Sequence, residues 1–328
     1  MQAQFEHFHA GEVAVHAEWG IDTEAYEQQS KQMMLPVINP QEHTLISGLT
    51  FSFAGTIDVA GRPWASPLLA GAEQLFTITS DTAMTIARQH GEGDPFQQNV
   101  ADTNELSVLF FDTSTRRRAK SIGRGTLTES GEVLYEMTRL FGICPKYIFQ
   151  REHTPATKVE STSPEHRERL DDADMAHLRR SDTIFFASHS EHGADVTHRG
   201  GAPGFVRVLD ESTFEIPDYL GNGMFNTLGN LRLDDRLGVT TVDFETGRTL
   251  HITGRATTKA TGLALPEPER SVTIKVEEWL SLGSLLGAGS TLGHLDTPQT
   301  FSRSKTPITS RRHSPEVPAR TTIHSEQP

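Results

Sequence analysis

The sequence has 328 residues and a formal net charge of −13, because 43 acidic side chains outnumber 30 basic ones. A chain of this length suits two folded units with appendages better than one ordinary domain. The acidic excess argues against nucleic acid and anionic membrane surfaces as partners, since the phosphate groups of both would repel it.

The cysteine content and the first residues of the chain bear on its compartment. Cys144 is the one cysteine, which excludes an intrachain disulfide and a cysteine-built metal site and suits a reducing compartment. The N-terminal residues contain neither the basic segment nor the apolar core of a secretory signal. No run approaches the roughly 18 apolar residues that a membrane-spanning helix needs. We therefore expect a soluble, cytoplasmic protein.

Residues 1–38 are expected to form a helical N-terminal extension, and residues 39–150 a first folded unit. This unit begins with a helix, because Asn39 suits the N-cap position and Pro40 the first helical position. Short β-rich runs separated by turn residues then predict strands at 49–57, 71–80, 106–112 and 122–128.

The segment 130–147 closes the first unit, and we expect it to be an amphipathic helix that covers one end of a barrel. Gly142 and Pro145 would end this helix. Its apolar residues recur at helical spacing: Val133, Leu134, Met137, Leu140 and Phe141.

A second unit is expected over residues 151–296. It opens with a short helix that begins at Asp171 and ends near Arg180. The expected strands follow at 183–188, 204–212, 237–243 and 252–258. Residues 297–328 are rich in Ser, Thr, Pro and Arg with few apolar residues, so we predict a disordered tail.

The two units repeat each other at a constant offset of 131 residues. Between positions 99 and 126, 8 of 28 residues are identical to those 131 positions later, beginning with Asn99 and Asn230. Two unrelated strand pairs with similar turns are the alternative, but the order of expected elements also matches. Short, evenly spaced strands favour a mainly β barrel or sandwich over a βαβ sheet.

Glycine-rich and polar clusters in the second unit are candidates for binding a phosphate-bearing ligand. In residues 197–201, Thr-His-Arg-Gly-Gly, the glycines can expose backbone N–H groups and Arg199 can donate two hydrogen bonds to a phosphate. Asn226 and Asn230 supply amides that could pair with the polar edge of a heterocycle. The alternative is that these are ordinary turn residues. Neither a P-loop nor a GxGxxG motif is present.

The motifs THRGGAPGFV, PDYLGNGMFNTLGN and VDFETGRTLHITGRA resemble the pyridoxamine 5′-phosphate oxidase-like family of FMN-binding split barrels. The first unit resembles the same family through GRPWASPLLAG, NELSVLFFD, RRRAKSIGRG and FGICPKYI. The resemblance covers about residues 40–260. It implies two tandem six-stranded split barrels that form an intrachain pseudo-dimer with FMN between them. A homodimer of whole chains is a further option.

The resemblance also implies which residues bind FMN. Residues resembling the phosphate turn are Thr197, His198, Arg199, Gly200 and Gly201, and those resembling the second wall are Asp218, Gly221, Asn222, Asn226 and Asn230. The first unit would complete the site with Arg117, Lys146 and Tyr147, although a solvated basic turn is an alternative for the arginine. At the 131-residue offset, Ser66-Pro67-Leu68 replaces Thr197-His198-Arg199, so we predict one FMN site per chain.

The function that these features favour is a flavin-dependent oxidoreductase with a small-molecule substrate and NAD(P)H or another electron donor. The alternative is a non-catalytic flavin- or haem-binding sensor or storage protein, since His189, His192 and His198 lie near the expected site. The sequence has no clear second cluster of basic residues that could bind a substrate phosphate. This argues against pyridoxamine 5′-phosphate oxidase activity itself. No metal motif is present among the histidines, and no catalytic residue is assigned.

Overall fold

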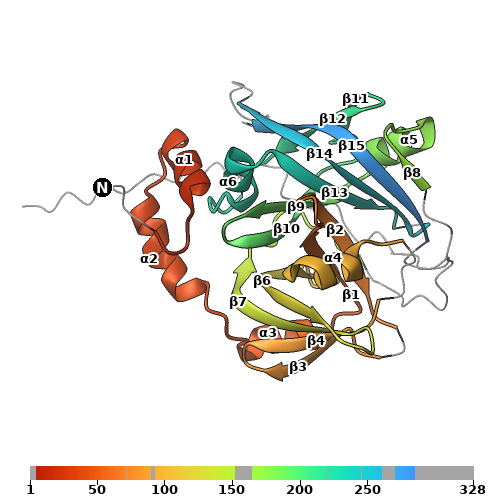
Figure 1. Ribbon diagram of the computed structural model, residues 1–328. Helices are drawn as coiled ribbons and strands as arrows, with labels where there is room; N and C mark the ends of the chain where they lie inside the picture. The colour runs from red at the N-terminus through yellow and green to blue at the C-terminus, as the bar shows by residue number, and fades with distance from the viewer. Residues whose placement is uncertain are drawn as a thin grey trace, which may run out of the picture.

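The computed structural model describes residues 5–71, 73–89, 93–151, 165–219, 221–244, 246–260 and 270–284. The predicted tail, 297–328, lies outside these ranges. Within them the protein is mainly β, with two antiparallel sheets that lie one above the other in Figure 1. None of the helices in these ranges combines the length and the apolar character that crossing a membrane requires.

The first copy begins with helix α3, Pro40–Ser47, whose N-terminus is capped by the Asn39 side chain, as predicted. Its strands form a sheet in the order β2-β1-β5-β6-β7-β4-β3, and helix α4, Phe96–Thr103, lies between β4 and β5 in the chain. The strands are β1 Phe51–Ile57, β2 Pro63–Leu69, β3 Phe76–Ser80, β4 Ala83–Ile86, β5 Glu105–Asp112, β6 Arg117–Leu127 and β7 Val133–Ile143.

The second copy follows the same plan, which confirms the tandem repeat. Helix α5, Asp172–Arg180, precedes a sheet in the corresponding order β10-β9-β13-β14-β15-β12-β11, and α6, Asn226–Leu233, occupies the place of α4. The short strand β8, Glu165–Arg167, pairs with β15. The other strands are β9 Thr183–Ser190, β10 Gly193–Gly200, β11 Arg207–Asp210, β12 Thr213–Asp218, β13 Arg236–Val242, β14 Arg248–Ala260 and β15 Arg270–Ser284.

The predicted helix at 130–147 is wrong, because its central part is strand β7, which pairs with β6 and β4. Val133, Tyr135 and Met137 are buried, whereas the intervening Leu134 is 47% exposed. This period of two belongs to a strand, and the helical pattern arose by counting Leu134 as part of the buried face. Each sheet path consequently holds seven strands, where the family resemblance implies six.

The two copies pack against each other through an apolar cluster drawn from both sheets. Phe53 of β1 and Phe185 of β9 stack there with ring centroids 3.4 Å apart. The two residues are equivalent, because Phe53 lies opposite Leu109 and Phe185 opposite Thr240, 131 positions later. Equivalent residues meet each other across a two-fold axis, so the chain contains the predicted pseudo-dimer.

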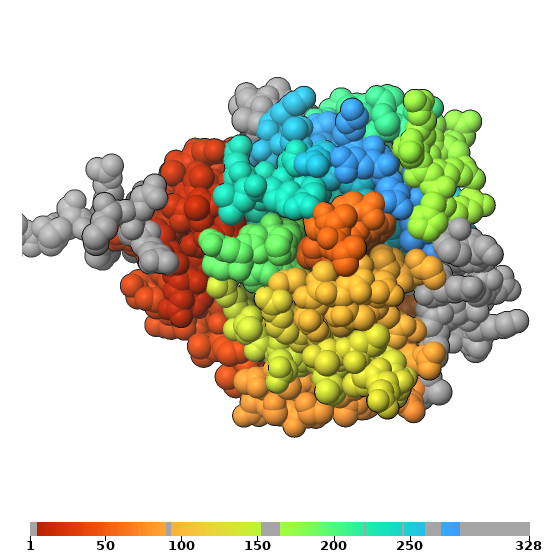
Figure 2. Space-filling model, viewed as in Figure 1, coloured from red at the N-terminus to blue at the C-terminus, as the bar shows by residue number. Residues whose placement is uncertain are grey.

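Two helices precede the first copy, α1 at Ala10–Glu18 and α2 at Thr23–Met33. Helix α1 packs on α6 of the second copy at a close crossing of Gly11 and Gly229. A Cβ atom on Gly11 would lie 2.1 Å from the Gly229 carbonyl oxygen, so the two backbones touch. Figure 2 shows this N-terminal part in red, covering the flank of the molecule where the copies meet.

Candidate functional site

A pocket opens between the two copies, beside the start of α6. The second copy contributes the end of β10, the segment around 217–228 and Arg270. The first copy contributes residues of β6 and β7 and of the segment 144–147. Its cavity volume is about 100 Å³, which is below the roughly 300–1,000 Å³ of most small-molecule sites.

Most of the predicted cofactor residues line this pocket. They are Thr197, His198, Arg199, Gly200, Asp218, Gly221, Asn222, Asn226, Lys146 and Tyr147. Arg117, Gly201 and Asn230 are not part of the lining. The pocket therefore joins both motifs of the second copy to the segment that follows β7 of the first.

The Thr-His-Arg-Gly-Gly motif lies mostly in strand β10 and does not form the predicted anion-binding turn. Its residues up to Gly200 pair with β9. A Cβ atom on Gly200 would lie 2.1 Å from the Tyr147 carbonyl oxygen, so this glycine permits the close approach of the two copies. Gly201 donates its N–H to the Asp182 carbonyl oxygen and packs against Phe205, which accounts for its place outside the pocket.

Arg199 faces the pocket and is held there by an acidic partner. Its guanidinium lies 2.8 Å from Asp218, and the other carboxylate oxygen of Asp218 accepts from Arg270 at 2.9 Å. In the part of the chain that the structure describes, Arg199 Nε and one terminal nitrogen of Arg270 are buried without a hydrogen-bond partner. The Asp218 carboxylate thus positions two guanidinium groups, and each of them keeps at least one N–H donor without a partner among the described residues.

His198 points from β10 toward the first copy, where Arg118 of β6 meets it. Arg118 donates from Nη1 to His198 Nδ1 at 2.8 Å, so the histidine proton resides on Nε2. Burial, followed by the charge of Arg118, holds the pKa of His198 well below its usual range. Burial also lowers the pKa of Arg118 to about 10. His198 is therefore neutral, and its Nε2 is buried with no partner among the described residues.

The arginine that reaches the pocket from the first copy is Arg118, whereas Arg117 was predicted. Arg117 donates instead to the carbonyl oxygen of Gln41 in α3. Successive side chains of a strand point to opposite faces, so Arg118 and Lys120 face the pocket together. If a strand is assigned from Arg117 onward, the alternation of side chains places Arg117 and Arg118 on opposite faces of the sheet.

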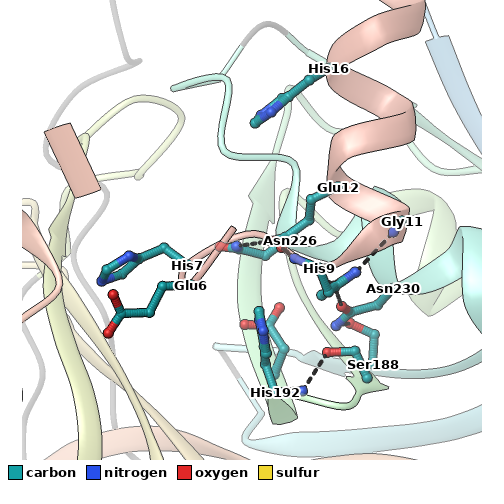
Figure 3. A network of polar contacts seen from close by, with 12 residues as sticks. Glu6, His7, His9, Gly11, Glu12, His16, Ser188, His192, Asn226 and Asn230 are labelled. Carbon is teal, nitrogen blue, oxygen red and sulfur yellow. Dashed lines mark hydrogen bonds and ion pairs between the residues drawn. The ribbon is translucent and has the colours of Figure 1, made fainter. Parts of the chain in front are cut away.

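Lys120 is buried among groups from three other elements. It forms an ion pair with Asp195 of β10 and donates to Asn226 Oδ1 at 3.0 Å. The Asn226 Nδ2 group donates to Glu12 of α1 at 2.5 Å (Figure 3). Both ends of the Asn226 amide are consequently engaged by protein groups.

Asn230 lies one helical turn further along α6. Its side chain is outside the pocket and joins α6 to two other segments by hydrogen bonds. Its Nδ2 donates to Ser188 Oγ at 2.9 Å, and its Oδ1 accepts from His9 Nε2 at 2.7 Å (Figure 3). Asn230 is therefore placed outside the pocket lining, with both ends of its amide bonded to protein groups. Sequence reasoning missed His9 and Glu12, because each lies more than 200 positions from its partner and belongs to no motif.

Three potential metal ligands, His9, Glu12 and His192, lie close together beside this network. His9 Nδ1 accepts a hydrogen bond from the Gly11 N–H, so it carries no proton and Nε2 does. A metal ion on Nε2 would require that proton to move to Nδ1, where it would face the Gly11 donor. This arrangement suits a hydrogen-bonded network and not a metal centre.

The pocket lining is strongly cationic for a protein of this net charge. It contains five basic side chains and one carboxylate, that of Asp218: Arg118, Lys120, Lys146, Arg199 and Arg270. Tyr147 and Tyr219 stack at its edge with ring centroids 5.3 Å apart. Tyr147 and Phe225 adopt left-handed backbone conformations, with φ of 65° and 56°, a strain often found at functional sites.

The position related to this pocket by the pseudo-two-fold axis has other residues, among them the buried pair of His251 and Asp94. Leu280 lies opposite His251 as Phe141, in the pocket, lies opposite Lys120. Trp64 packs on Leu280 and Leu282 there, in a cluster that is almost fully buried. The pocket and its pseudo-symmetric counterpart are therefore lined by different residues. The replacement of Thr197-His198-Arg199 by Ser66-Pro67-Leu68 in the first copy predicts such a difference.

No family model matches the chain, and no curated protein matches it. Three solved structures that match part of it are HupZ from Group A Streptococcus, a protein from Lactobacillus delbrueckii proposed to be a pyridoxamine 5′-phosphate oxidase, and an F420 reductase. Their identities are 18%, 13% and 12%, and their TM-scores 0.29, 0.29 and 0.26. They cover 37%, 37% and 34% of this chain, and 100%, 98% and 98% of their own. The second bears the name of the family that the motifs resemble.

Proposed function

We propose that this protein is a flavoprotein that binds one FMN in the pocket between its two copies and uses it for oxidoreductase chemistry. The observation that carries the proposal is the charge of the pocket. Five basic side chains and one carboxylate line it, and one of the five, Lys120, is paired with Asp195 outside the lining, in a chain whose net charge is −13. Such a concentration of positive charge suits an anionic ligand such as a phosphate ester.

The hydrogen-bonding state of the lining agrees with a polar ligand. His198 Nε2, Arg199 Nε and a terminal nitrogen of Arg270 are buried without partners in the described ranges. Buried donors are rarely left unpaired, so these groups fit a site whose ligand supplies acceptors. Arg199 and Lys146 would hold the phosphate, and the aromatic side chains of Tyr147, Tyr219 and Phe225 would contact the ring system.

The proposed number of FMN molecules per chain follows from the different residues at the two interface positions. At the second interface position Leu68 stands where Arg199 would be needed, and Trp64 occupies the space beside Leu280. Among the described residues, that position therefore lacks the guanidinium group that Arg199 would offer to a phosphate. The proposed content is one FMN per chain.

Bound FMN supplies hydride or electron transfer, and the protein supplies binding and orientation. The proposed partners are a small-molecule substrate and a reductant such as NAD(P)H. His198, being neutral and fixed by Arg118, would present an N–H group to the bound ligand. A flavin that is bound but not reduced by NAD(P)H or another donor would favour the sensor or storage alternative.

An FMN titration of the purified protein tests the proposal, followed by flavin fluorescence. Arg199→Ala should weaken binding by about 1.5–3 kcal/mol, because a charged hydrogen bond to the phosphate is lost. Arg207→Ala is a matched control, since Arg207 is an exposed residue of the same copy that pairs with Glu215. Unchanged affinity in the Arg199 variant, or a stoichiometry near two, would contradict the proposed site.

A further inference from the structure

The N-terminal residues 5–34, which include α1 and α2 and are here named the N-terminal helix pair, contact the wall of the pocket directly. Tyr26 donates its hydroxyl to the Asn222 carbonyl oxygen at 3.3 Å, and His16 Nε2 lies 2.9 Å from the Gly223 carbonyl oxygen. Gly223 has a φ of +80°, and a Cβ there would lie 2.6 Å from the Tyr26 hydroxyl. The loop before α6 is thus fitted closely against both helices.

A second connection runs through Glu12, which is buried under α6. Its carboxylate accepts from Asn226 Nδ2 at 2.5 Å and from the His9 backbone N–H at 3.0 Å (Figure 3). Asn226 in turn accepts from Lys120 at 3.0 Å, and both of these residues line the pocket. Glu12 therefore fixes the orientation of the Asn226 amide and, through it, the position of the Lys120 ammonium group.

A third connection lies at the C-terminal end of α1. The Trp19 ring lies 4.1 Å from the guanidinium carbon of Arg270, and Phe225 lies 4.6 Å from the same carbon. Arg270 holds Asp218, and Asp218 holds Arg199. The proposed phosphate-binding guanidinium is thereby linked to α1 through one carboxylate and one aromatic contact.

Apolar packing joins the same three parts of the protein. Phe8 and Met34, at the two ends of the N-terminal helix pair, form a buried cluster with Phe141 of β7 and Met224 of the pocket loop. Phe141 belongs to the first copy and Met224 to the second. The helix pair consequently spans the seam on which the pocket lies.

We infer that the N-terminal helix pair is a positioning element of the cofactor pocket, whose docking and the binding of FMN stabilise each other. This inference rests on the proposed function. It assigns to Glu12 and Trp19 the task of holding Lys120 and Arg199 in their binding positions. Because coupling between two binding events is reciprocal, FMN should also strengthen the docking of α1.

Gly11→Val tests the inference, because the new side chain meets the backbone of Gly229 and must displace α1 from α6. FMN affinity should fall about tenfold or more, within the usual range of coupling between sites. Ala17→Val is the matched control, since Ala17 lies on the exposed face of the same helix. Its affinity should stay within about twofold of the parent chain.

Glu12 gives a second test that keeps α1 in place on its apolar contacts. Glu12→Ala should weaken FMN binding, because the Asn226 amide, which accepts from Lys120, is no longer held on its other side. Glu12→Gln should restore most of the affinity, since its side-chain oxygen can still accept from Asn226. Hydrogen exchange of residues 10–18 in the parent chain, with and without FMN, measures the reciprocal effect, and slower exchange with FMN is expected.

The outcomes separate this inference from the proposed function. If the parent chain does not bind FMN at all, the proposed function is wrong. If FMN binds equally well to the parent chain, Gly11→Val and Glu12→Ala, while hydrogen exchange shows α1 released in Gly11→Val, the proposed function stands and the positioning role is wrong.

Discussion

Arg118 of the first copy donates a hydrogen bond to Nδ1 of His198 in the second copy, at 2.8 Å. The same guanidinium donates to the carbonyl oxygens of Cys144 at 2.9 Å and Lys146 at 3.4 Å. One side chain thus satisfies three acceptors on both sides of the seam. Its neighbour Arg117 is exposed and, within the described ranges, donates to the Gln41 carbonyl oxygen alone, so the two arginines can be compared as a pair.

Arg118→Ala should destabilise the protein by about 3 kcal/mol, because the buried His198 and two part-buried carbonyl oxygens lose their donor. Arg117→Ala should change the free energy of unfolding by less than about 0.5 kcal/mol, as is usual for exposed residues. Urea unfolding followed by circular dichroism measures both changes. Equal effects of the two substitutions would show that Arg118 has no special part in joining the copies.

Acid should destabilise the protein through its buried histidines. Burial lowers the pKa of His177 to about 4, whereas the unfolded chain takes up the proton near pH 6.5. Acid therefore favours the unfolded chain, so stability present above pH 6.5 is lost as the pH falls toward 4, by at most about 3 kcal/mol. Burial lowers the pKa in the same direction for His9, His16, His192, His198 and His251.

Free energies of unfolding at pH 7 and pH 5 check this expectation. His177→Gln should reduce the loss of stability between the two values, because glutamine takes up no proton. His43→Gln is the control, since His43 is exposed on α3. A pH dependence that is the same in the parent chain and in His177→Gln would contradict a neutral, buried His177.

The repeat and most strands were predictable because they depend on local residue patterns. The 131-residue offset aligns the motifs of the two copies, and β1, β5, β9 and β13 are rich in β-branched and aromatic residues. Strand β7 was missed because Leu134 is apolar and yet exposed at the surface of the sheet. A pattern of residue types cannot show which apolar side chains face solvent.

The candidate site was predictable only in part, for a related reason. Arg199, Asp218 and Tyr147 belong to motifs that resemble a family, so their positions could be carried over. Glu12 belongs to no motif, and Lys120 lies in RRRAKSIGRG but was not assigned to the site; each acquires its role through a partner more than 70 positions away. Such pairings arise only when α1 and the two sheets pack together. They cannot be inferred from the residues that neighbour Glu12 or Lys120 in the sequence.

Glu12 should give a pH dependence of the opposite sign to that of the histidines. Burial raises its pKa to about 7, from 4.5 for an exposed glutamate. The folded state then holds the proton more tightly than the unfolded chain, so this contribution to stability is complete below pH 4.5 and is lost as the pH rises through 7. Glu12→Gln should remove it and stabilise the protein at pH 8 relative to the parent chain, by up to about 3 kcal/mol.

The difference in unfolding free energy between pH 8 and pH 5, measured for the parent chain and for Glu12→Gln, isolates this contribution. The histidines are common to both proteins and cancel in the comparison. A variant that is less stable than the parent chain at pH 8 would show that the ionised carboxylate is stabilised by Lys120 more strongly than burial penalises it.

Trp64 lies at the second interface position, where it bears on the number of flavins that each chain binds. Trp64→Ala removes the ring that packs on Leu280 and Leu282, and the cavity should destabilise the protein by about 3–5 kcal/mol. The flavin-to-protein ratio should nevertheless stay near one, because Leu68 still stands in place of the phosphate-binding arginine. Trp64→Phe, which retains an aromatic ring, is the control for stability. A ratio near two in Trp64→Ala would mean that the tryptophan ring, and not the missing arginine, closes the second position.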